Sequence, residues 1–180
     1  RTVGRVAPEA VYHLGGWSDV GGSWDAPVAT FRANAEGTLN LLQACRETGA
    51  RVLVVSSADI YGKVTEADLP LGEDAPVRPV SPYAASKSAA DQLALQAWLG
   101  YGIETLRVRA FNHLGPGQTT RFVAPALAAR IARCEVEDRE VVTVGNLTPR
   151  RDFTDVRDVV RAYRLLIEHG VPGETDTAAT

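Results

Sequence analysis

The sequence has 180 residues, of which 45% are hydrophobic and 23% are charged, and its formal net charge is −3. These values fit one globular domain and give no indication of a nucleic-acid or membrane-surface partner, because either would favour a basic surface. No apolar run is long enough to cross a bilayer, no signal-peptide pattern opens the chain, and no metal site is predicted. Cys45 and Cys134 fit small buried thiols, so we expect a cytoplasmic protein.

The sequence also contains no methionine, opens on what reads as the tail of a helix, and closes without a stop signal. We therefore expect a piece of a longer protein.

The first predicted strand covers residues 10–14, a short apolar run that stops at Gly15 and Gly16. Apolar residues then recur at three- and four-residue steps over 28–48, which predicts an amphipathic helix. Asn34 lies on or near the apolar face of this helix and therefore needs a polar partner.

A second buried strand is predicted over residues 51–56, and it ends in two hydroxyl side chains, Ser56 and Ser57. Residues 58–80 follow as a long loop with several Pro, Gly and acidic residues, and loops of this length are often functional. A second helix is predicted over residues 83–98.

The second half of the chain continues the alternation of strand and helix. The predicted elements are a strand at 104–111, an ordered loop at 112–118, a helix at 123–133, a short strand at 141–145, and a helix from about 154 that Gly170 closes. Buried strands that alternate with helices predict an α/β fold with a parallel sheet.

Candidate chemistry gathers around Ser57, Tyr83 and Lys87. Tyr83 and Lys87 are four residues apart, so their side chains lie on one helical face. A nearby ammonium favours the phenolate, so we expect a lowered Tyr83 pKa and proton exchange near neutral pH. Ligands of open α/β sheets bind at the carboxyl ends of strands, where Ser57 would reach the same reacting oxygen. The Tyr-Lys spacing alone is also typical of an ordinary exposed helical turn.

The chain resembles the extended short-chain dehydrogenase/reductase family, the epimerases, dehydratases and reductases of sugar nucleotides, over essentially its whole length. The resemblance depends on His13-Leu14-Gly15-Gly16, residues 34–42, Ser56-Ser57 through Gly62, Ser81-Pro82-Tyr83 through Lys87, and Arg109-Ala110-Phe111-Asn112. Within the family, residues 111–118, 150–160 and 171–174 are similar to GDP-4-keto-6-deoxymannose reductases, of which GDP-mannose 4,6-dehydratases are close relatives.

This resemblance implies a Rossmann-like parallel sheet flanked by helices, incomplete, in one partial NAD(P)-binding domain over residues 1–180. Elements of a smaller substrate-binding region would lie within about 111–153 and at the C-terminal end. NADP or NAD is the implied cofactor, a nucleotide sugar the implied substrate, and a homodimer of the full-length parent the implied assembly. Helices 28–48 and 83–98 would form the interface of that dimer.

The resemblance also implies a role for each matching residue. Tyr83 would exchange a proton with the sugar C4 oxygen, Ser57 would hydrogen-bond that oxygen, and Lys87 would hold the nicotinamide ribose. The implied cofactor-binding residues are Leu14, Gly15, Gly16, Asn34, Ser56, Tyr83 and Lys87. The implied substrate-binding residues are Asn112, Val123 and Arg151, whose guanidinium suits phosphate oxygens.

Two departures from the family pattern lie near these residues. Dehydratases carry an acid–base glutamate just after the residue that corresponds to Ser57, whereas Ala58 and Asp59 follow here. Asp59 is one methylene shorter, so we favour ketone reduction, with a dehydratase that uses Asp59 as the alternative. Ala110 replaces the usual proline, and Gly15-Gly16 replace alanines, so we expect a looser backbone near the cofactor.

The largest departure is that no Gly-x-x-Gly-x-x-Gly motif occurs in the sequence. The family uses this motif to bind the cofactor pyrophosphate at a helix N-terminus. We therefore expect poor cofactor binding by this chain alone, and a non-catalytic chain remains a further alternative. We also expect strand 10–14 to have an unpaired edge.

Overall fold

The computed structural model describes residues 2–176, which form two compact units. The first unit contains the residues up to Phe111 and those from Arg161 onward, and the second contains Asn112–Val160. The second unit overlaps the segment in which substrate-binding elements are predicted.

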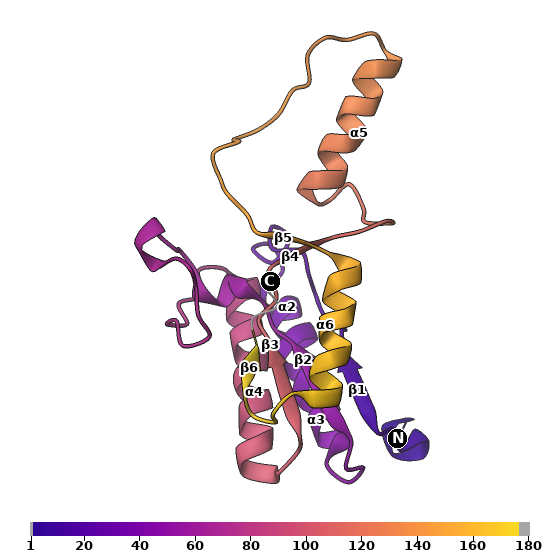
Figure 1. Cartoon of the computed structure of the whole chain (residues 1–180), viewed down its shortest axis with the longest axis vertical. Helices are drawn as coiled ribbons and strands as arrows, with labels where there is room; N and C mark the ends of the chain where they lie inside the picture. The colour runs from indigo at the N-terminus through magenta and orange to yellow at the C-terminus, as the bar shows by residue number, and fades with distance from the viewer. Residues whose placement is uncertain (1, 177–180) are drawn as a thin grey trace. The chain divides into compact units, whose positions relative to one another are not determined.

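A four-stranded parallel sheet forms the centre of the first unit (Figure 1). Its strands lie in the order β1 (Ala10–His13), β2 (Arg51–Val55), β3 (Thr105–Val108) and β6 (Thr175–Asp176). The prediction of a parallel α/β sheet is therefore confirmed. Within residues 2–176, β1 pairs with β2 alone, so it is an edge strand as expected.

The helices of the first unit follow the predicted order. They are α1 (Thr2–Val6), α2 (Pro27–Phe31), the π-helical segment η1 (Arg32–Glu36), α3 (Gly37–Cys45), α4 (Pro82–Tyr101) and α6 (Val156–His169), which begins in the second unit. The long loop after β2 contains two short 3₁₀ segments, η2 (Ala58–Tyr61) and η3 (Glu66–Asp68). Among residues 2–176, no helix has the length and apolar character needed to cross a membrane.

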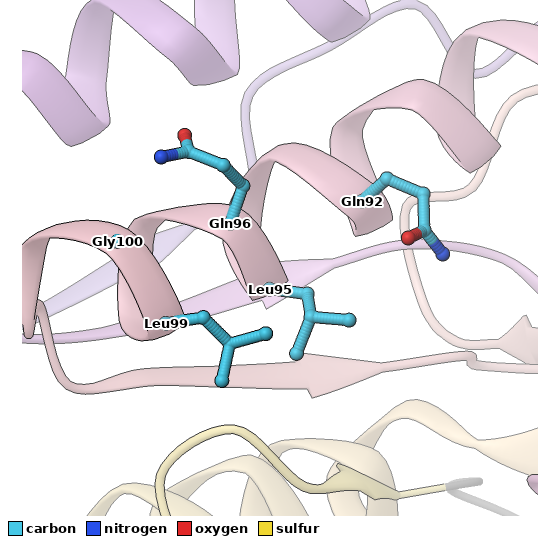
Figure 2. Close-up of a pocket in the computed structure, with 5 residues that line it drawn as sticks. All are labelled: Gln92, Leu95, Gln96, Leu99 and Gly100. Atoms are coloured by element: carbon cyan, nitrogen blue, oxygen red, sulfur yellow. The ribbon is translucent and has the colours of Figure 1, made fainter.

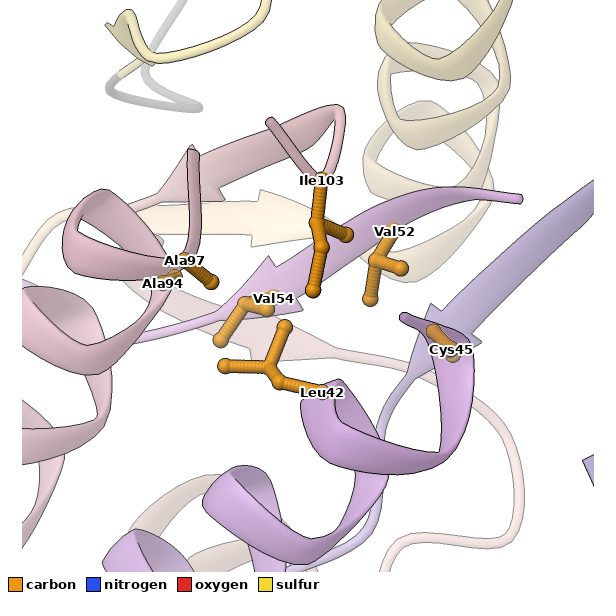
Figure 3. Packing of buried hydrophobic residues seen from close by; sticks show 7 residues of the cluster. All are labelled: Leu42, Cys45, Val52, Val54, Ala94, Ala97 and Ile103. Carbon is orange, nitrogen blue, oxygen red and sulfur yellow. The ribbon is translucent and has the colours of Figure 1, made fainter. Parts of the chain in front are cut away.

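The two faces of the sheet are covered by different helices, because side chains alternate along a strand. Val52 and Val54 pack with side chains of α3 and α4 in the main core cluster, together with Ile103 (Figure 3). Leu53 and Leu106 are fully buried on the opposite face, where the Cδ2 of Leu106 closely approaches Gly170 after α6. The sheet is thus the middle of three layers (Figure 1).

The buried stripe of the first long helix differs from the prediction. Val28, Phe31 and Leu39 were expected to face the core but are 64%, 49% and 36% exposed. Thr30, Asn34 and Thr38 are buried instead, together with three of the expected residues, Ala35, Leu42 and Cys45. The cause is the π-helical turn, since its wider turn shifts the phase of the residues on either side of it.

The second unit contains β4 (Asn112–Leu114), α5 (Val123–Val136) and β5 (Phe153–Asp155). β4 pairs in parallel with β5, so the predicted ordered loop at 112–118 begins with a strand. The prediction of a strand at 141–145 is wrong, because this apolar run has no regular structure and Val141 is 74% exposed. Its carbonyls contact α5 instead, where the Cys134 thiol donates to Val141 O and Arg130 donates to Thr143 O.

A buried ion-pair cluster joins α4 to β3. The Asp91 carboxylate of α4 is fully buried and accepts from Arg107 Nη1 at 2.9 Å and from Arg109 Nε and Nη2 at 3.2 Å each. Both arginines are less than a tenth exposed, because alternate residues of the strand point toward the same helix. Two guanidinium groups therefore depend on one carboxylate for their neutralisation.

We expect Asp91→Ala to lower the free energy of unfolding by about 3–5 kcal/mol, since it leaves two buried cations without their anion. Urea unfolding followed by circular dichroism measures this change. Gln92→Ala is the matched control, because Gln92 is the exposed neighbour on the same helix. Equal unfolding midpoints for the two variants would contradict the role of Asp91 in neutralising the two buried arginines.

Candidate active site

Ser57 lies at the carboxyl edge of the sheet, two residues after β2 ends. The backbone pairing of β2 with β3 continues past the ends of both strands, since Ser56 N donates to Val108 O at 2.7 Å and Ala58 N donates to Ala110 O at 2.9 Å. Ser57 itself is extended and is the N-cap of η2, where its Oγ accepts from Asp59 N at 3.2 Å. The hydroxyl is thus held by both the sheet and the following turn.

Tyr83 is the second residue of α4, which begins abruptly because Ser81 is its N-cap and Pro82 occupies the first position. The backbone N–H of Tyr83 donates to Ser23 Oγ at 3.2 Å, and its phenol is buried near the Ser57 hydroxyl, whose interaction with it lowers the phenol pKa. The structure therefore brings Ser57 and Tyr83 together, as the sequence predicted.

The prediction that the Tyr83 pKa is lowered is wrong for this structure. Burial of the phenol raises its pKa above the ordinary value, the Ser57 hydrogen bond lowers it, and the negative charge of Asp59 raises it. Burial dominates because the phenolate loses its hydration, whereas helical spacing alone carries no information about burial. Tyr83 is therefore a protonated phenol near neutral pH.

Lys87 lies one turn after Tyr83 on α4, and its Nζ donates to the Val55 carbonyl at 2.9 Å. Burial lowers its pKa from 10.5 to about 8, because the ammonium is removed from water. An ammonium has three N–H donors, and the Val55 carbonyl occupies one of them. The Lys87 backbone carbonyl accepts from Ser56 Oγ at 3.3 Å, which ties the helix to the end of β2.

Asn34 fixes the loop that follows β1. Its side chain is 1% exposed, and its Oδ1 accepts from Trp17 N at 2.7 Å while its Nδ2 donates to Trp17 O at 3.1 Å. The same Nδ2 donates to Ser86 Oγ at 2.8 Å, so the amide joins the loop to α4. Asn34 lies in the π-helical segment, a feature that is frequent at functional sites.

The Gly15-Gly16 turn lies directly against this amide. A Cβ at Gly16 would lie 2.6 Å from Asn34 Oδ1 and 3.6 Å from Lys87 Nζ, so only glycine fits without a shift. Asn34 binds the chain next to Gly16 on both backbone polar groups of Trp17, and the expectation of a looser backbone stays a prediction. At Ala110 the backbone likewise stays paired, through its carbonyl.

These features fit the nicotinamide-ribose end of a dinucleotide cofactor. The bare backbone of Gly15 and Gly16 permits close approach, and the Lys87 ammonium beside it has donors that suit ribose hydroxyls. Leu14 is 66% exposed at the same turn. Direct contact of Leu14, Asn34 and Ser56 with a cofactor stays a prediction, because the described contacts of the two polar side chains are within the protein.

The predicted substrate-binding residues all belong to the second unit. Asn112 begins β4, Val123 begins α5, and Arg151 precedes β5 with its Nη1 donating to Arg150 O at 2.7 Å. All three side chains are exposed. Their roles toward a nucleotide sugar stay predictions.

Sequence reasoning missed two groups of residues that organise the site. Ser23 anchors the first turn of α4, and the Asp91 cluster anchors its third turn. Arginines at positions 107 and 109 in an otherwise apolar strand were the available signal for a buried partner, because unpaired buried charges are very costly.

The C-terminal half of α4 carries a shallow surface depression lined by Gln92, Leu95, Gln96, Leu99 and Gly100 (Figure 2). Its lining residues all come from one helix and include none of the catalytic candidates. Among residues 2–176, no group of three His, Cys, Asp or Glu side chains is arranged to hold a metal ion.

A helix-flanked parallel sheet with Ser57, Tyr83 and Lys87 at its carboxyl edge defines an extended short-chain dehydrogenase/reductase. More narrowly, the chain belongs to the GDP-mannose 4,6 dehydratase family, whose model matches residues 1–180.

The relatives are sugar-nucleotide reductases and dehydratases. The chain is 43% identical over 169 residues to GDP-6-deoxy-D-mannose reductase of Pseudomonas aeruginosa. This alignment covers 92% of this chain and 56% of the relative. It is 32% identical over 178 residues to GDP-mannose 4,6-dehydratase of Sinorhizobium fredii, and this alignment covers 97% of this chain and 50% of the relative. The structure of RMD from Pseudomonas aeruginosa complexed with NADPH matches with a TM-score of 0.90 and 42% identity. The match covers 96% of this chain and 60% of that chain. The chain thus spans about half the length of the curated relatives it matches.

We expect the ε-carbon NMR signal of Lys87 to titrate with a midpoint near pH 8 in ¹³C-lysine-labelled protein, with Lys63 as the second signal. Because the folded pKa lies below the unfolded value, the unfolded chain binds one more proton between about pH 8 and 10.5. The free energy of unfolding should therefore rise through this window relative to Lys87→Met. A midpoint above pH 10 would show that Lys87 is not buried.

Proposed function

We propose that the chain is the catalytic part of an NAD(P)-dependent reductase that acts on the C4 ketone of a GDP-4-keto-6-deoxyhexose. The observation that supports this most is the proximity of the Ser57 hydroxyl to the buried Tyr83 phenol, whose burial raises its pKa and keeps it protonated. Reduction of a ketone consumes a proton at the carbonyl oxygen, so the acid must begin the reaction in its protonated state. The likeness to a GDP-6-deoxy-D-mannose reductase agrees with this choice.

In the proposed reaction, the ketone oxygen lies between the two hydroxyls. Ser57 donates a hydrogen bond that stabilises the negative charge developing on this oxygen, and Tyr83 transfers its phenolic proton to it. The cofactor, when bound, supplies the hydride that reaches the carbonyl carbon. The product is the corresponding alcohol, with one hydride on carbon and one proton on oxygen.

Lys87 has two proposed tasks. Its remaining N–H donors hold the ribose hydroxyls beside Gly16, and its positive charge stabilises the Tyr83 phenolate once the proton has left. A pKa of about 8 places the ammonium form in the majority at neutral pH, so both tasks are available there. Asn34 keeps the Gly16 loop at the distance that the first task requires.

The proposed substrate contacts come from the second unit. Arg151 would bind the diphosphate of the nucleotide sugar in bidentate geometry, with Asn112 and Val123 beside it. The cofactor in the structure of the Pseudomonas relative is NADPH, whereas a dTDP-glucose 4,6-dehydratase of Streptomyces venezuelae contains NAD, so both cofactors belong in the test.

A second candidate function is GDP-mannose 4,6-dehydration, with Asp59 as the base. Asp59 is exposed on η2, and its charge acts on the Tyr83 phenol, so a carboxylate lies near the proposed reacting group. Its short side chain argues against reach to the sugar C5 and C6. The remaining alternative is a chain without catalytic activity.

The test incubates the purified chain with each cofactor and, separately, with GDP-mannose and GDP-4-keto-6-deoxymannose. Mass spectrometry of the products should show a gain of two hydrogens on the keto sugar and no loss of water from GDP-mannose. Water loss from GDP-mannose would instead establish the dehydratase. No turnover, combined with no change in cofactor fluorescence at millimolar NADPH or NADH, would assign the chain to the non-catalytic alternative.

Tyr83→Phe should reduce turnover at least about 100-fold, because a positioned general acid contributes that much or more. Cofactor affinity should change little, since Lys87 and Gly16 are retained. Tyr101→Phe is the matched control, because Tyr101 is exposed at the other end of the same helix. Full turnover in Tyr83→Phe would remove Tyr83 from the acid role.

We also propose that the parent protein is cytoplasmic and forms a homodimer through α2, α3 and α4. Exposed apolar side chains on these helices support the dimer, among them Val28, Phe31 and Leu99. Analytical ultracentrifugation of the chain and of Leu99→Glu measures this, and the variant should shift the equilibrium toward monomer. A monomeric wild-type chain at high protein concentration would contradict pairing of this chain.

A further inference from the structure

Three residues of α4 lie on one helical face at successive four-residue steps, namely Tyr83, Lys87 and Asp91. The first two belong to the candidate site, whereas Asp91 is fully buried two turns away from Tyr83. The proposed function gives Asp91 no task, yet it holds two arginines. What those arginines contact beyond Asp91 differs between them.

Arg109 connects Asp91 to the turn that carries Ser57. Its Nε and Nη2 donate to the Asp91 carboxylate, and its Nη1 donates to Tyr61 Oη at 3.2 Å. The guanidinium also lies over the Tyr61 ring, with its carbon 5.4 Å from the ring centre, in a cation–π contact. Tyr61 is 3% exposed and ends the same 3₁₀ segment that Ser57 caps.

The same Arg109 atom also holds the long loop. Its Nη1 donates to Glu73 O at 2.7 Å, and further along the loop Arg78 N donates to Ile60 O at 2.8 Å. Both ends of η2 are therefore fixed by the segment that follows β3, namely by Arg109 and Ala110. Arg109 reaches the far end, and the backbone pair of Ala58 N with Ala110 O fixes the near end.

Arg107 provides an internal comparison. It donates to the same Asp91 oxygen at 2.9 Å, but its second contact is Gly173 O at 3.0 Å, in the turn before β6. Arg107 thus shares the anion and the burial of Arg109, yet its described contacts do not include η2 or the loop. Any effect that is special to the Ser57 turn should appear for Arg109 and not for Arg107.

We propose that Arg109 is a positioning residue. Its ion pair with Asp91 fixes the guanidinium, and its contact with Tyr61 fixes the 3₁₀ turn that holds the Ser57 hydroxyl near the Tyr83 phenol. A planar guanidinium suits this task because its five donors point in fixed directions, so one side chain can join a helix, a 3₁₀ turn and a loop at once. This inference rests on the proposed function, since the distance between the two hydroxyls matters only if both act on one substrate oxygen.

The test follows the protonation of Tyr83 in the intact chain by ¹⁹F NMR after incorporation of 3-fluorotyrosine. The sequence has five tyrosines, and Tyr83→Phe identifies the resonance of interest. The titratable groups that face Tyr83 are the Asp59 carboxylate on η2, which raises its pKa, and the phenol of Tyr163 on α6, while Lys87 lies one turn further along α4. All variants retain these three groups. Arg109→Lys keeps the charge but loses the fork of donors.

Arg109→Lys should raise the Tyr83 pKa by about 0.5–1 unit, the amount expected for loss of the hydrogen bond from Ser57. Ser57→Ala should give the same shift, and adding Arg109→Lys to Ser57→Ala should give no further shift, because the two changes remove one interaction. Tyr61→Phe, the milder variant, should give a smaller shift of the same sign. Arg107→Lys should leave the titration of Tyr83 unchanged.

Three outcomes would overturn the inference. They are no shift in Arg109→Lys, shifts that add in the double variant, and an equal shift in Arg107→Lys, which would mean general loosening of the fold. The titration needs neither cofactor nor substrate, so its result stands apart from the reductase assay. A chain that reduces no keto sugar but shows the coupling would refute the proposed function alone.

Discussion

The ion pairs of Asp91 with Arg107 and Arg109 are the interaction on which the arrangement of the first unit depends. A carboxylate without access to water is tolerated because two guanidiniums surround it, one from the inner strand β3 and one from the residue that follows β3. The cluster sets where α4 lies against the sheet. Since Tyr83 and Lys87 belong to the same rigid helix, it also sets where these side chains lie relative to the carboxyl ends of the strands.

Around this anchor, the site is built from short polar contacts between elements distant in sequence. The amide of Asn34 joins the loop after β1 to α4, and the carbonyl of Val55 receives the Lys87 ammonium. Ser57 reaches Tyr83 from a turn that is paired with the end of β3. The result is a buried, protonated phenol one helical turn from a half-buried cation, a combination suited to delivering a proton while charge develops on a bound carbonyl.

Much of this fold was predictable from the sequence, because strand 51–56 is largely an apolar run, strand 104–111 alternates apolar and polar residues, and the Tyr83 helix has a strong start signal. The meeting of Ser57 with Tyr83 was predictable from their order along an α/β chain. Two other expectations failed for physical reasons. The Tyr83 pKa depends on burial, which spacing does not report, and the apolar run at 141–145 has strand propensity but no partner strand.

The π-helical segment at Arg32–Glu36 has a consequence for how this helix tolerates changes in length. A π-turn accommodates one residue more than an α-turn, and each residue turns an α-helix by about 100°. Deleting a single residue there would convert the π-turn into an α-turn and keep the phase of α3, so Leu42 would stay in the core. A deletion within α3 itself would instead rotate the residues beyond it by about 100° and carry them out of the core. Insertions and deletions should therefore be confined to segments such as the loop after η2, where no helical phase has to be preserved.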